Sequence, residues 1–514
     1  MSNDATNNIE RVNRSKNSKR NAIYGFVCKS IQLLLPFILR YVIINNLGIE
    51  YLGVNGFCTS VLQVLNAIDL GFSEAVLFNL YKPLAEKDSI KVKAIMHYYH
   101  RVYMIMGTMV FLLGICIIPF TNKMIKGDVP LGVNIYIAFF VYLINSTISY
   151  FGGAYKALLL YAGQRNDLNT IATTIAKLVV EIAQIIFIIK TRNYYSYLFL
   201  LPVATILYNA SVSQITKKKY PEYIGKEKIN SNMRKEMRVN IFAIAIDRIK
   251  TVSRNSFDSI VISSFLGLSI VGIYNNYFYI LTGVLTLTYV LSTSITASIG
   301  DSIAIESVEK NFYDFQRINF LYMWVTVVSA ACFLCTIQPF MEIWMGKEYL
   351  FEFRTAVLFV IYYYSLQMCE VFMIYFKGAG LWKHRLYRGV VASGLNVILN
   401  IFLGYYWGVN GIVLATILSV VLIDYFYTSK LLFKYYFSSE KYYNYIKSSI
   451  MILISAILDI SLTYMISSIL AENIVIKLLA CVVISFSIWI LILGKTRIFH
   501  ESVKFALVRI RRNG

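Results

Sequence analysis

The chain has 514 residues, of which 57% are hydrophobic and only 15% are charged, and its mean hydropathy is +0.60. Soluble domains carry about 25% charged residues, so this composition excludes a soluble globular protein as well as a disordered or collagen-like chain. Lys and Arg outnumber Asp and Glu by 49 to 28, which gives a net charge of +21. In a soluble chain that excess would suggest nucleic acid. Here we expect no nucleic-acid partner and ascribe the excess to membrane orientation.

Apolar blocks of about twenty residues predict membrane-spanning helices, and the chain contains fourteen of them. The second and eighth blocks exceed about 25 residues, so we expect both to tilt, break or extend beyond the bilayer. In chain order the blocks are 22–45, 52–80, 98–120, 131–155, 168–189, 194–216, 239–265, 268–299, 316–339, 354–376, 386–405, 409–433, 445–468 and 474–494. The sequence therefore predicts an all-α polytopic membrane protein.

The basic residues favour one orientation of these helices. With both termini in the cytoplasm, 36 of the 49 Lys and Arg residues fall in the tails and loops of the cytoplasmic side or at the helix ends beside them. Seven fall on the opposite side and six lie inside helices, which is a strong positive-inside bias. The basic segment 217–238 indicates contact with anionic lipids, with a partner-binding role as the alternative. No outer loop exceeds about fifteen residues, so no extracytoplasmic catalytic domain is expected.

Two stretches of the chain repeat each other. Gly48 and Gly53 bracket the start of the second predicted helix, and Gly267 and Gly272 bracket the start of the eighth, 219 positions later. The same offset pairs Lys29 with Arg248. We therefore expect two six-helix bundles in parallel-repeat relation, plus two C-terminal helices. The predicted organisation is a basic cytoplasmic tail (1–20), a first bundle (21–216), a basic linker (217–238), a second bundle (239–433), helices thirteen and fourteen (434–494) and a second basic tail (495–514).

The seven cysteines all lie in apolar stretches, and Cys332 and Cys335 form a C-x-x-C pair without a second ligand pair. We interpret them as small packing residues rather than metal ligands or redox groups. The four histidines are not grouped with nucleophiles or other metal ligands, and no phosphate-binding glycine loop is present. The sequence thus predicts no catalytic residue, no metal and no cofactor.

Several short motifs resemble those of one transporter family. Residues 47–56 (LGIEYLGVNG) and the Asp69-Leu-Gly71-Phe72 stretch resemble the second helix of O-antigen and capsule flippases. Residues 299–307 resemble the end of their eighth helix, and Ile343–Tyr349 their 9–10 loop. The chain thus resembles the polysaccharide transporter branch of the multidrug/oligosaccharidyl-lipid/polysaccharide exporters. The resemblance implies export of lipid-linked oligosaccharides by alternating access between two six-helix bundles.

Charges within predicted helices mark candidate functional residues, because a charge at the bilayer centre costs at least about 2.5 kcal/mol. On the seventh helix, Asp247, Lys250, Arg254 and Asp258 fall on one face, with Arg248 on an adjacent stripe. One reading is a self-neutralising ladder of Asp–Lys and Arg–Asp pairs. The other, which we favour, is a face that lines a polar cavity.

The cations outside the seventh helix have similar alternatives. Lys29 in the first helix has no acid three or four residues away, and we expect it to face the cavity with Arg248 and Arg254. Arg40 is expected to snorkel to the outer surface. Lys177 and Glu181 are spaced for a structural salt bridge, and a cavity role for Lys177 is the alternative. The predicted head-group set is Lys29, Arg248, Arg254, Lys250 and Lys177.

Acids in the same helices are candidates for coupling to H⁺ or Na⁺. Asp69 is the first candidate, because it lies beside Gly71, where we expect the second helix to break. Asp258 is the second, and Asp247 and Glu74 complete the set. An unpaired membrane carboxylate is readily protonated. The alternative for Asp69 is a structural pair with Lys29 or Arg248.

The function expected from the resemblance is a non-enzymatic flippase in a bacterial plasma membrane. Its expected substrate is an anionic undecaprenyl-pyrophosphate-linked oligosaccharide, whose charge Arg and Lys would offset. Membrane lipids and a glycan polymerase are the other expected partners. The alternatives are a lipid II flippase and a drug or organic-cation antiporter on the same fold. A membrane glycan polymerase or ligase is disfavoured by the short outer loops.

Overall fold

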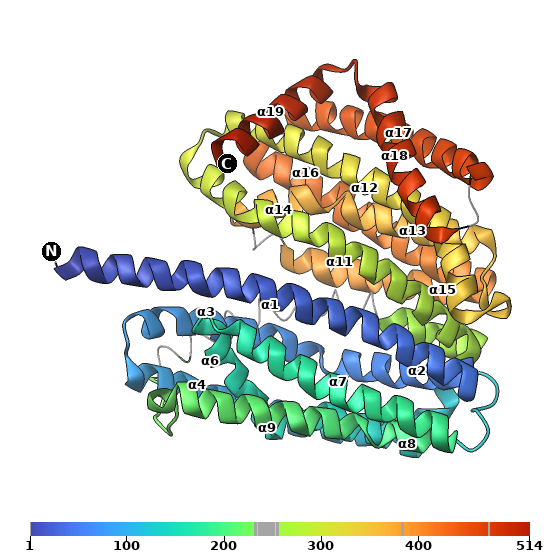
Figure 1. The fold of residues 1–514 in the computed structure, drawn as a ribbon. Helices are drawn as coiled ribbons and strands as arrows, with labels where there is room; N and C mark the ends of the chain where they lie inside the picture. Colours follow the sequence, from blue (N-terminus) through green and yellow to red (C-terminus); the bar gives the residue numbers. More distant parts are fainter. Residues whose placement is uncertain are drawn as a thin grey trace. The chain divides into compact units, whose positions relative to one another are not determined.

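The computed structural model describes residues 2–230, 234, 252, 256–381, 385–470 and 473–513. Within these ranges the side chains of residues 2–19, 22, 68–71, 74, 75, 297, 385–388, 470 and 509–513 are not described. Every regular element in the described ranges is a helix (Figure 1). The chain forms two compact units, Met1–Gly272 and Ile273–Gly514. The all-α prediction is therefore confirmed.

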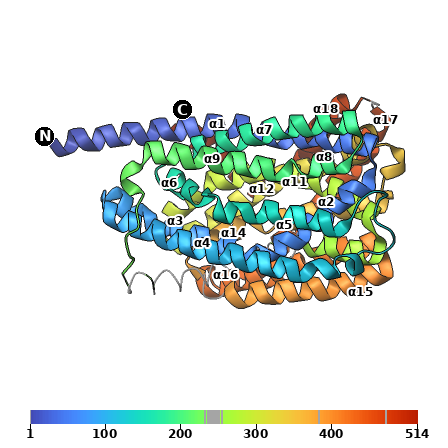
Figure 2. The same cartoon turned by 90° about the horizontal axis from the view of Figure 1, so that it is seen from below.

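The first unit is a bundle built around long apolar helices. In Figure 2, α1, α7 and α9 run side by side, and α1 packs along much of α7. Polar caps fix where helices begin: the Asp88 carboxylate accepts from the backbone N–H of Lys91 at the start of α4, and Asn134 caps α5 in the same way. The helices are α1 (Ser2–Asn46), α2 (Ile49–Leu65), α3 (Ala67–Ala85), α4 (Ser89–Ile117), α5 (Ile135–Phe151), α6 (Ala157–Ala162), α7 (Asn166–Thr191), α8 (Tyr194–Leu198), α9 (Leu201–Lys219), the helix Ser256–Leu266 and the first turn of α11 (Leu268–Ile305).

In the second unit, α12 (Val308–Met345) is the central helix, and α13, α17 and α18 pack against it. The fully buried Trp489 of α18 lies 6.0 Å from the ring of Phe320 on α12. The two C-terminal spans, expected as an addition to the bundles, thus share the core of this unit. The remaining helices are α13 (Phe353–Gln367), α14 (Glu370–Gly378), α15 (Arg385–Ser419), α16 (Thr428–Leu432), α17 (Glu440–Leu470), α18 (Ile474–Leu493) and α19 (Arg497–Asn513).

The segment labelled α15 is a helical hairpin. Gly408 has φ 57° and ψ −137°, which interrupts the helix. The Asn396 amide donates to the Thr416 hydroxyl at 3.1 Å, although twenty residues of straight helix would place them about 30 Å apart. The two arms must therefore run antiparallel, as the separate predicted blocks 386–405 and 409–433 require. The second arm continues through two π-helical stretches, Val420–Tyr427 and Phe433–Phe437.

Ten helices in the described residues are long and apolar enough to cross a membrane, or eleven if the bent pair α5–α6 counts as one span. The predicted number of fourteen membrane-spanning helices is not confirmed, and four segments of the chain account for the difference. The second block is divided into α2 and α3 at Asn66, the fourth is the bent pair, and the hairpin of α15 counts once. The seventh block lies mostly outside the described residues, which leave only Ser256–Leu266 of it.

Three predicted boundaries differ from the structure. The tail 1–20 belongs to α1, which begins at Ser2. The second helix breaks at Asn66, and α3 is continuous through Gly71. Asn66 is held there by α5, since its amide donates to Ser146 Oγ at 2.7 Å and its Oδ1 accepts from Tyr150 OH at 2.8 Å. The first compact unit also extends to Gly272 rather than ending at the basic segment 217–238.

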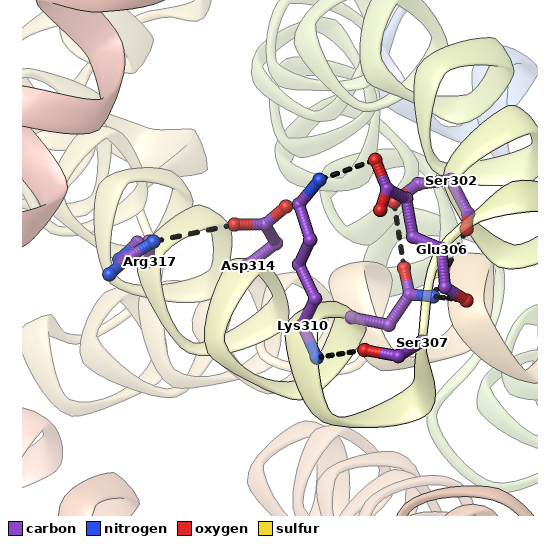
Figure 3. A network of polar contacts seen from close by, with 7 residues as sticks. Ser302, Glu306, Ser307, Lys310, Asp314 and Arg317 are labelled. Atoms are coloured by element: carbon purple, nitrogen blue, oxygen red, sulfur yellow. Dashed lines mark hydrogen bonds and ion pairs between the residues drawn. The ribbon is translucent and has the colours of Figure 1, made fainter.

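The motif at residues 299–307 forms the turn between α11 and α12 (Figure 3). Ser307 caps α12 by accepting from the backbone N–H of Lys310 at 3.2 Å, and Glu306 contacts the Lys310 ammonium. Ser302 Oγ donates to Asn311 Oδ1 at 2.8 Å, which ties the end of α11 to α12. This part of the family-like sequence therefore specifies a helix-to-helix turn.

Candidate functional site

The two repeated glycine motifs meet in the first unit, where the start of α2 crosses the start of α11. A Cβ on Gly53 would lie 2.0 Å from the carbonyl oxygen of Leu268, and a Cβ on Gly272 would lie 2.5 Å from that of Ile49. Only glycine permits backbones to approach this closely. Gly48 and Gly267 precede the two helices with φ of 130° and 89°, which also favour glycine. We call this contact, formed by residues 48–53 and 267–272, the glycine crossing.

The glycine crossing is reciprocal. Gly53 contacts Leu268, which is the repeat counterpart of Ile49, and Gly272, the counterpart of Gly53, contacts Ile49. Equivalent residues therefore exchange equivalent contacts, as in an interface with twofold symmetry. Ser269 donates its hydroxyl to Glu50 Oε1 at 2.9 Å, again across an offset of 219. The predicted repeat thus corresponds to a physical contact between the two motifs.

The 118–134 connection secures one side of the glycine crossing. The backbone N–H of Lys126 donates to the carbonyl of Ser263 at 2.8 Å, and Ser263 Oγ donates to the carbonyl of Met124 at 3.0 Å. Tyr51 OH donates to the carbonyl of Leu131, also at 3.0 Å. These bonds fix the helix Ser256–Leu266 and the start of α2 to the same loop.

The predicted head-group cations are only partly described. Arg248, Lys250 and Arg254 lie outside the described residues, as does Asp247. The two that are described, Lys29 on α1 and Lys177 on α7, both have exposed side chains. They lie on helices joined by polar contacts, including Gln32 Nε2 to Thr174 Oγ1 at 2.7 Å.

The expected Lys177–Glu181 salt bridge is not formed in the described part of the chain. The spacing is correct for one, but Lys177 is exposed while Oε2 of Glu181 is buried without a hydrogen-bond partner. The two side chains therefore take different environments on α7. Arg40, expected to snorkel, is half-buried.

The structure describes the side chain of only one of the predicted coupling acids, Asp258. Asp69 and Glu74 lie on α3, but their side chains are outside the description. Asp258 is fully buried in the first unit. It lies two residues from Ser256, whose hydroxyl donates to Gln63 Oε1 of α2 at 2.9 Å. Asp258 therefore sits at the end of the helix Ser256–Leu266 that is bonded to the last turn of α2, away from the glycine crossing.

The second unit has a polar line of its own, at the break between α13 and α14. Tyr322 OH donates to Gln367 Oε1 at 2.5 Å, and the Gln367 amide contacts Thr288. One turn further along α11, Ser292 Oγ donates to Glu370 Oε2 at 2.9 Å. Four helices, α11 to α14, thus bring hydroxyl, amide and carboxylate groups together inside an otherwise apolar unit.

Tyrosines of α11 serve packing. Tyr274 and Tyr277 are buried against the ring of Phe359, with ring centroids 5.6 and 5.5 Å away. Cys332, Cys335 and Cys481 likewise pack together between α12 and α18. Among the described residues no group of three His, Cys, Asp or Glu residues could hold a metal ion.

Comparison with known families agrees with this architecture. The family model described as "Polysaccharide biosynthesis protein" matches residues 18–299, more than half of the chain. The chain belongs to this family, and it is a multi-pass membrane protein. No curated protein matches it.

Solved structures show the same fold at low sequence identity. A structure of the lipid II flippase MurJ in an inward closed conformation has a TM-score of 0.65 and 13% identity, and covers 91% of this chain and 98% of its own. An inward-facing multidrug resistance MATE family transporter has a TM-score of 0.64 and 13% identity, with 79% and 96% covered. A variant of the Vibrio cholerae MATE transporter VcmN gives 0.54 and 14%, with 83% and 99% covered.

Sequence reasoning missed Glu50 and Ser269 as a pair, although both lie within the repeated motifs. The offset of 219 that links the glycines also links these two residues, and that signal would have identified them. It also missed the buried environment of Lys156, which falls between the predicted blocks 131–155 and 168–189. No periodicity marks that site, because it forms at a bend between α5 and α6.

Proposed function

We propose that this protein is a flippase that moves undecaprenyl-pyrophosphate-linked oligosaccharide repeat units across the bacterial plasma membrane for surface polysaccharide assembly. The family match over residues 18–299 carries the proposal. The fold shared with a lipid II flippase supports it, because the two kinds of substrate share a polyprenyl pyrophosphate chemistry. Both termini lie in the cytoplasm in this proposal, as the distribution of Lys and Arg favours.

In the proposed mechanism the glycine crossing closes the extracytoplasmic end of the transport path. The positive-inside distribution puts the loops at Gly48 and Gly267 on that side. Backbone contact excludes water over the crossing, while the single side-chain bond from Ser269 to Glu50 is readily broken and remade. Alternating access requires a closure that is tight but reversible, and these contacts have both properties.

The proposed cation set offsets the charge of the pyrophosphate. Lys29, Lys177, Arg248, Lys250 and Arg254 provide positive charge on the first, fifth and seventh predicted helices, and Arg can contact phosphate through two N–H groups at once. Asp69, Glu74, Asp247 and Asp258 remain candidates for exchange of H⁺ or Na⁺.

The experiment is transport of a fluorescent undecaprenyl-pyrophosphate glycan in proteoliposomes, compared with lipid II and with an organic cation. The proposal expects the glycan to be transported in preference to both. Arg248→Ala should reduce transport while the protein still inserts, and Arg248→Lys should restore part of it. The likeness to MurJ makes a lipid II flippase the second candidate, and faster transport of lipid II would select that function instead. Transport of the cation alone would refute both.

A further inference from the structure

A buried lysine lies where α5 bends into α6. The two helices meet at 50° around Gly152 and Gly153, and Gly153 takes a φ of 99°. The turn directs Lys156 inward, so that the residue is 91% buried, and its Nζ donates to Ser213 Oγ on α9 at 2.6 Å. No carboxylate in the described part of the chain forms an ion pair with it.

The aromatic side chains beside the Lys156 ammonium group do not neutralise its charge. Its Nζ lies 5.6 Å from the Tyr155 ring, and that ring stacks on His100 of α4 at 4.3 Å. Lys217, one turn beyond Ser213 on α9, acts electrostatically on Lys156 and is also positive. An ammonium group has three donors, and only one is used here. A buried charge without a counter-ion is costly, so this site favours an anion.

A second polar group at the same place has no partner. Asn209 lies one turn before Ser213 on α9, and both face the Gly152–Lys156 turn. Asn209 is 98% buried, yet neither its Nδ2 nor its Oδ1 has a hydrogen-bond partner in the described residues. A Cβ on Gly152 would lie 2.6 Å from that Nδ2, so the glycine leaves the amide its space. Gly152 itself is exposed.

We propose that Lys156, Ser213 and Asn209 form a binding site for a phosphate group that carries a neighbouring hydroxyl. Lys156 and the Asn209 amide N–H groups donate to the phosphate oxygens. The Asn209 carbonyl oxygen accepts from the hydroxyl, which explains why both ends of this amide lack a protein partner. Ser213 lies about 9 Å along α9 from the basic end at Lys219, near the level of lipid head groups.

This chemistry is found in the head group of phosphatidylglycerol and in soluble glycerol 3-phosphate. The site differs from the cation set of the proposed transport path and does not depend on which glycan is carried. A test therefore measures binding rather than transport. Purified full-length protein is reconstituted in nanodiscs of phosphatidylcholine, with phosphatidylglycerol added in one arm and soluble glycerol 3-phosphate in the other, and retained ligand is counted by native mass spectrometry.

Lys156→Met should weaken binding by at least about tenfold, because it removes a charge-assisted bond. Lys218→Met is the matched control: it removes an exposed positive charge from the same helix and should leave binding unchanged. Asn209→Asp should also abolish binding, since its carboxylate pairs with Lys156 in place of the phosphate. In this variant the new carboxylate neutralises the buried Lys156, so the protein should still fold. Asn209→Asp therefore tests the site even if Lys156→Met fails to fold.

Binding in the lipid arm alone assigns the site to a phospholipid, and binding in the soluble arm alone assigns it to a phosphate ester. Either result supports the site. Equal losses in Lys156→Met and Lys218→Met would show general electrostatic attraction and overturn the proposal. Binding in neither arm would leave water as the only occupant and overturn it as well.

Discussion

Gly53 and Leu268 approach so closely that a single methyl group on Gly53 would lie 2.0 Å from the Leu268 carbonyl oxygen. The obstacle is backbone rather than the end of a flexible side chain, so the contact cannot relax by a rotamer change. Two helices that start 219 residues apart in the sequence are therefore in backbone contact at this point, and a small side chain would disturb the contact.

Gly53→Ala should destabilise the protein by about 1–3 kcal/mol, because the helix start must shift to admit the methyl group. Gly272→Ala should behave similarly, given its 2.5 Å approach to the Ile49 carbonyl oxygen. Thermal unfolding in detergent measures both effects. Gly300→Ala in α11 is the control: nothing lies within 4 Å of its Cβ position, so a helical alanine there should be neutral or stabilising. Equal stability of all three variants would contradict the crossing.

Joining the two sides of the glycine crossing should stop transport. Glu50→Cys with Ser269→Cys places two thiols on facing turns of the crossing, where the side chains that they replace share a 2.9 Å hydrogen bond. Oxidation should join them, and transport of the glycan lipid should fall to the level of empty liposomes and return on reduction. Each single substitution is a control. Full transport by the oxidised pair would show that the crossing need not open.

Gly408→Ala should destabilise the hairpin of α15 by about 1–3 kcal/mol, because its φ of 57° and ψ of −137° are unfavourable for a residue with a Cβ. The expected result is reduced abundance in the membrane and a lower unfolding temperature. Gly394→Ala, in the same helical segment but with open space at its Cβ position, should retain wild-type behaviour. If both variants match the wild type, the backbone at Gly408 is not as described.

Docking of α19 should depend on pH through Glu501. A hydrogen bond from Arg497 lowers the pKa of Glu501, and Arg317 of α12 lies 3.5 Å from the same carboxylate. Arg497 lies on α19 itself, so only the contribution of Arg317 to this lowered pKa stabilises docking; it is present above the unfolded value of about 4.3 and is lost as the pH falls through the folded value. The pair is partly exposed, so we expect only about a severalfold effect.

Hydrogen exchange of α19 in the wild type and Glu501→Gln provides the measurement. At pH 7 the variant should exchange faster than the wild type. As the pH falls through the lowered pKa of Glu501 the two should converge, because the wild-type carboxyl is then protonated as well. Comparison at each pH removes the intrinsic pH dependence of exchange. A constant ratio at all pH values would show that Glu501 does not contribute to docking.

Ion coupling is tested with Asp69→Asn in proteoliposomes with and without a pH gradient. If Asp69 carries a proton, wild-type transport should depend on the gradient, and the variant should transport at one rate in both conditions. A structural Asp69 would instead reduce the abundance of the variant. Wild-type transport that is unaffected by both H⁺ and Na⁺ gradients would exclude coupling, and mass action would then drive export.

The long apolar blocks of the chain made the all-α class predictable from sequence, because such a block has few alternatives to a helix in a bilayer. The break at Asn66 was not predictable in the same way. Gly71 looks more like a helix breaker, but Asn66 is the residue whose amide is bonded from α5 on both its oxygen and its nitrogen. Tertiary contacts decided the position.

The candidate site likewise has features that the sequence predicts and features that depend on tertiary packing. The offset between Gly53 and Gly272 was visible in the sequence, whereas their contact depends on how two distant segments pack. Lys177 shows the opposite case: helical spacing suggested a partner in Glu181, but spacing does not state which way each side chain turns. Lys156 falls outside the predicted blocks, because the bend that buries it leaves no pattern in the sequence beyond two adjacent glycines.

The boundary between the two compact units falls within α11, whose first residues belong to the first unit and whose remainder belongs to the second. Backbone hydrogen bonds of a helix span four residues, so they bridge this boundary without interruption. The same helix therefore contributes Ser269 to the glycine crossing of the first unit and Thr288 and Ser292 to the polar contacts within the second unit.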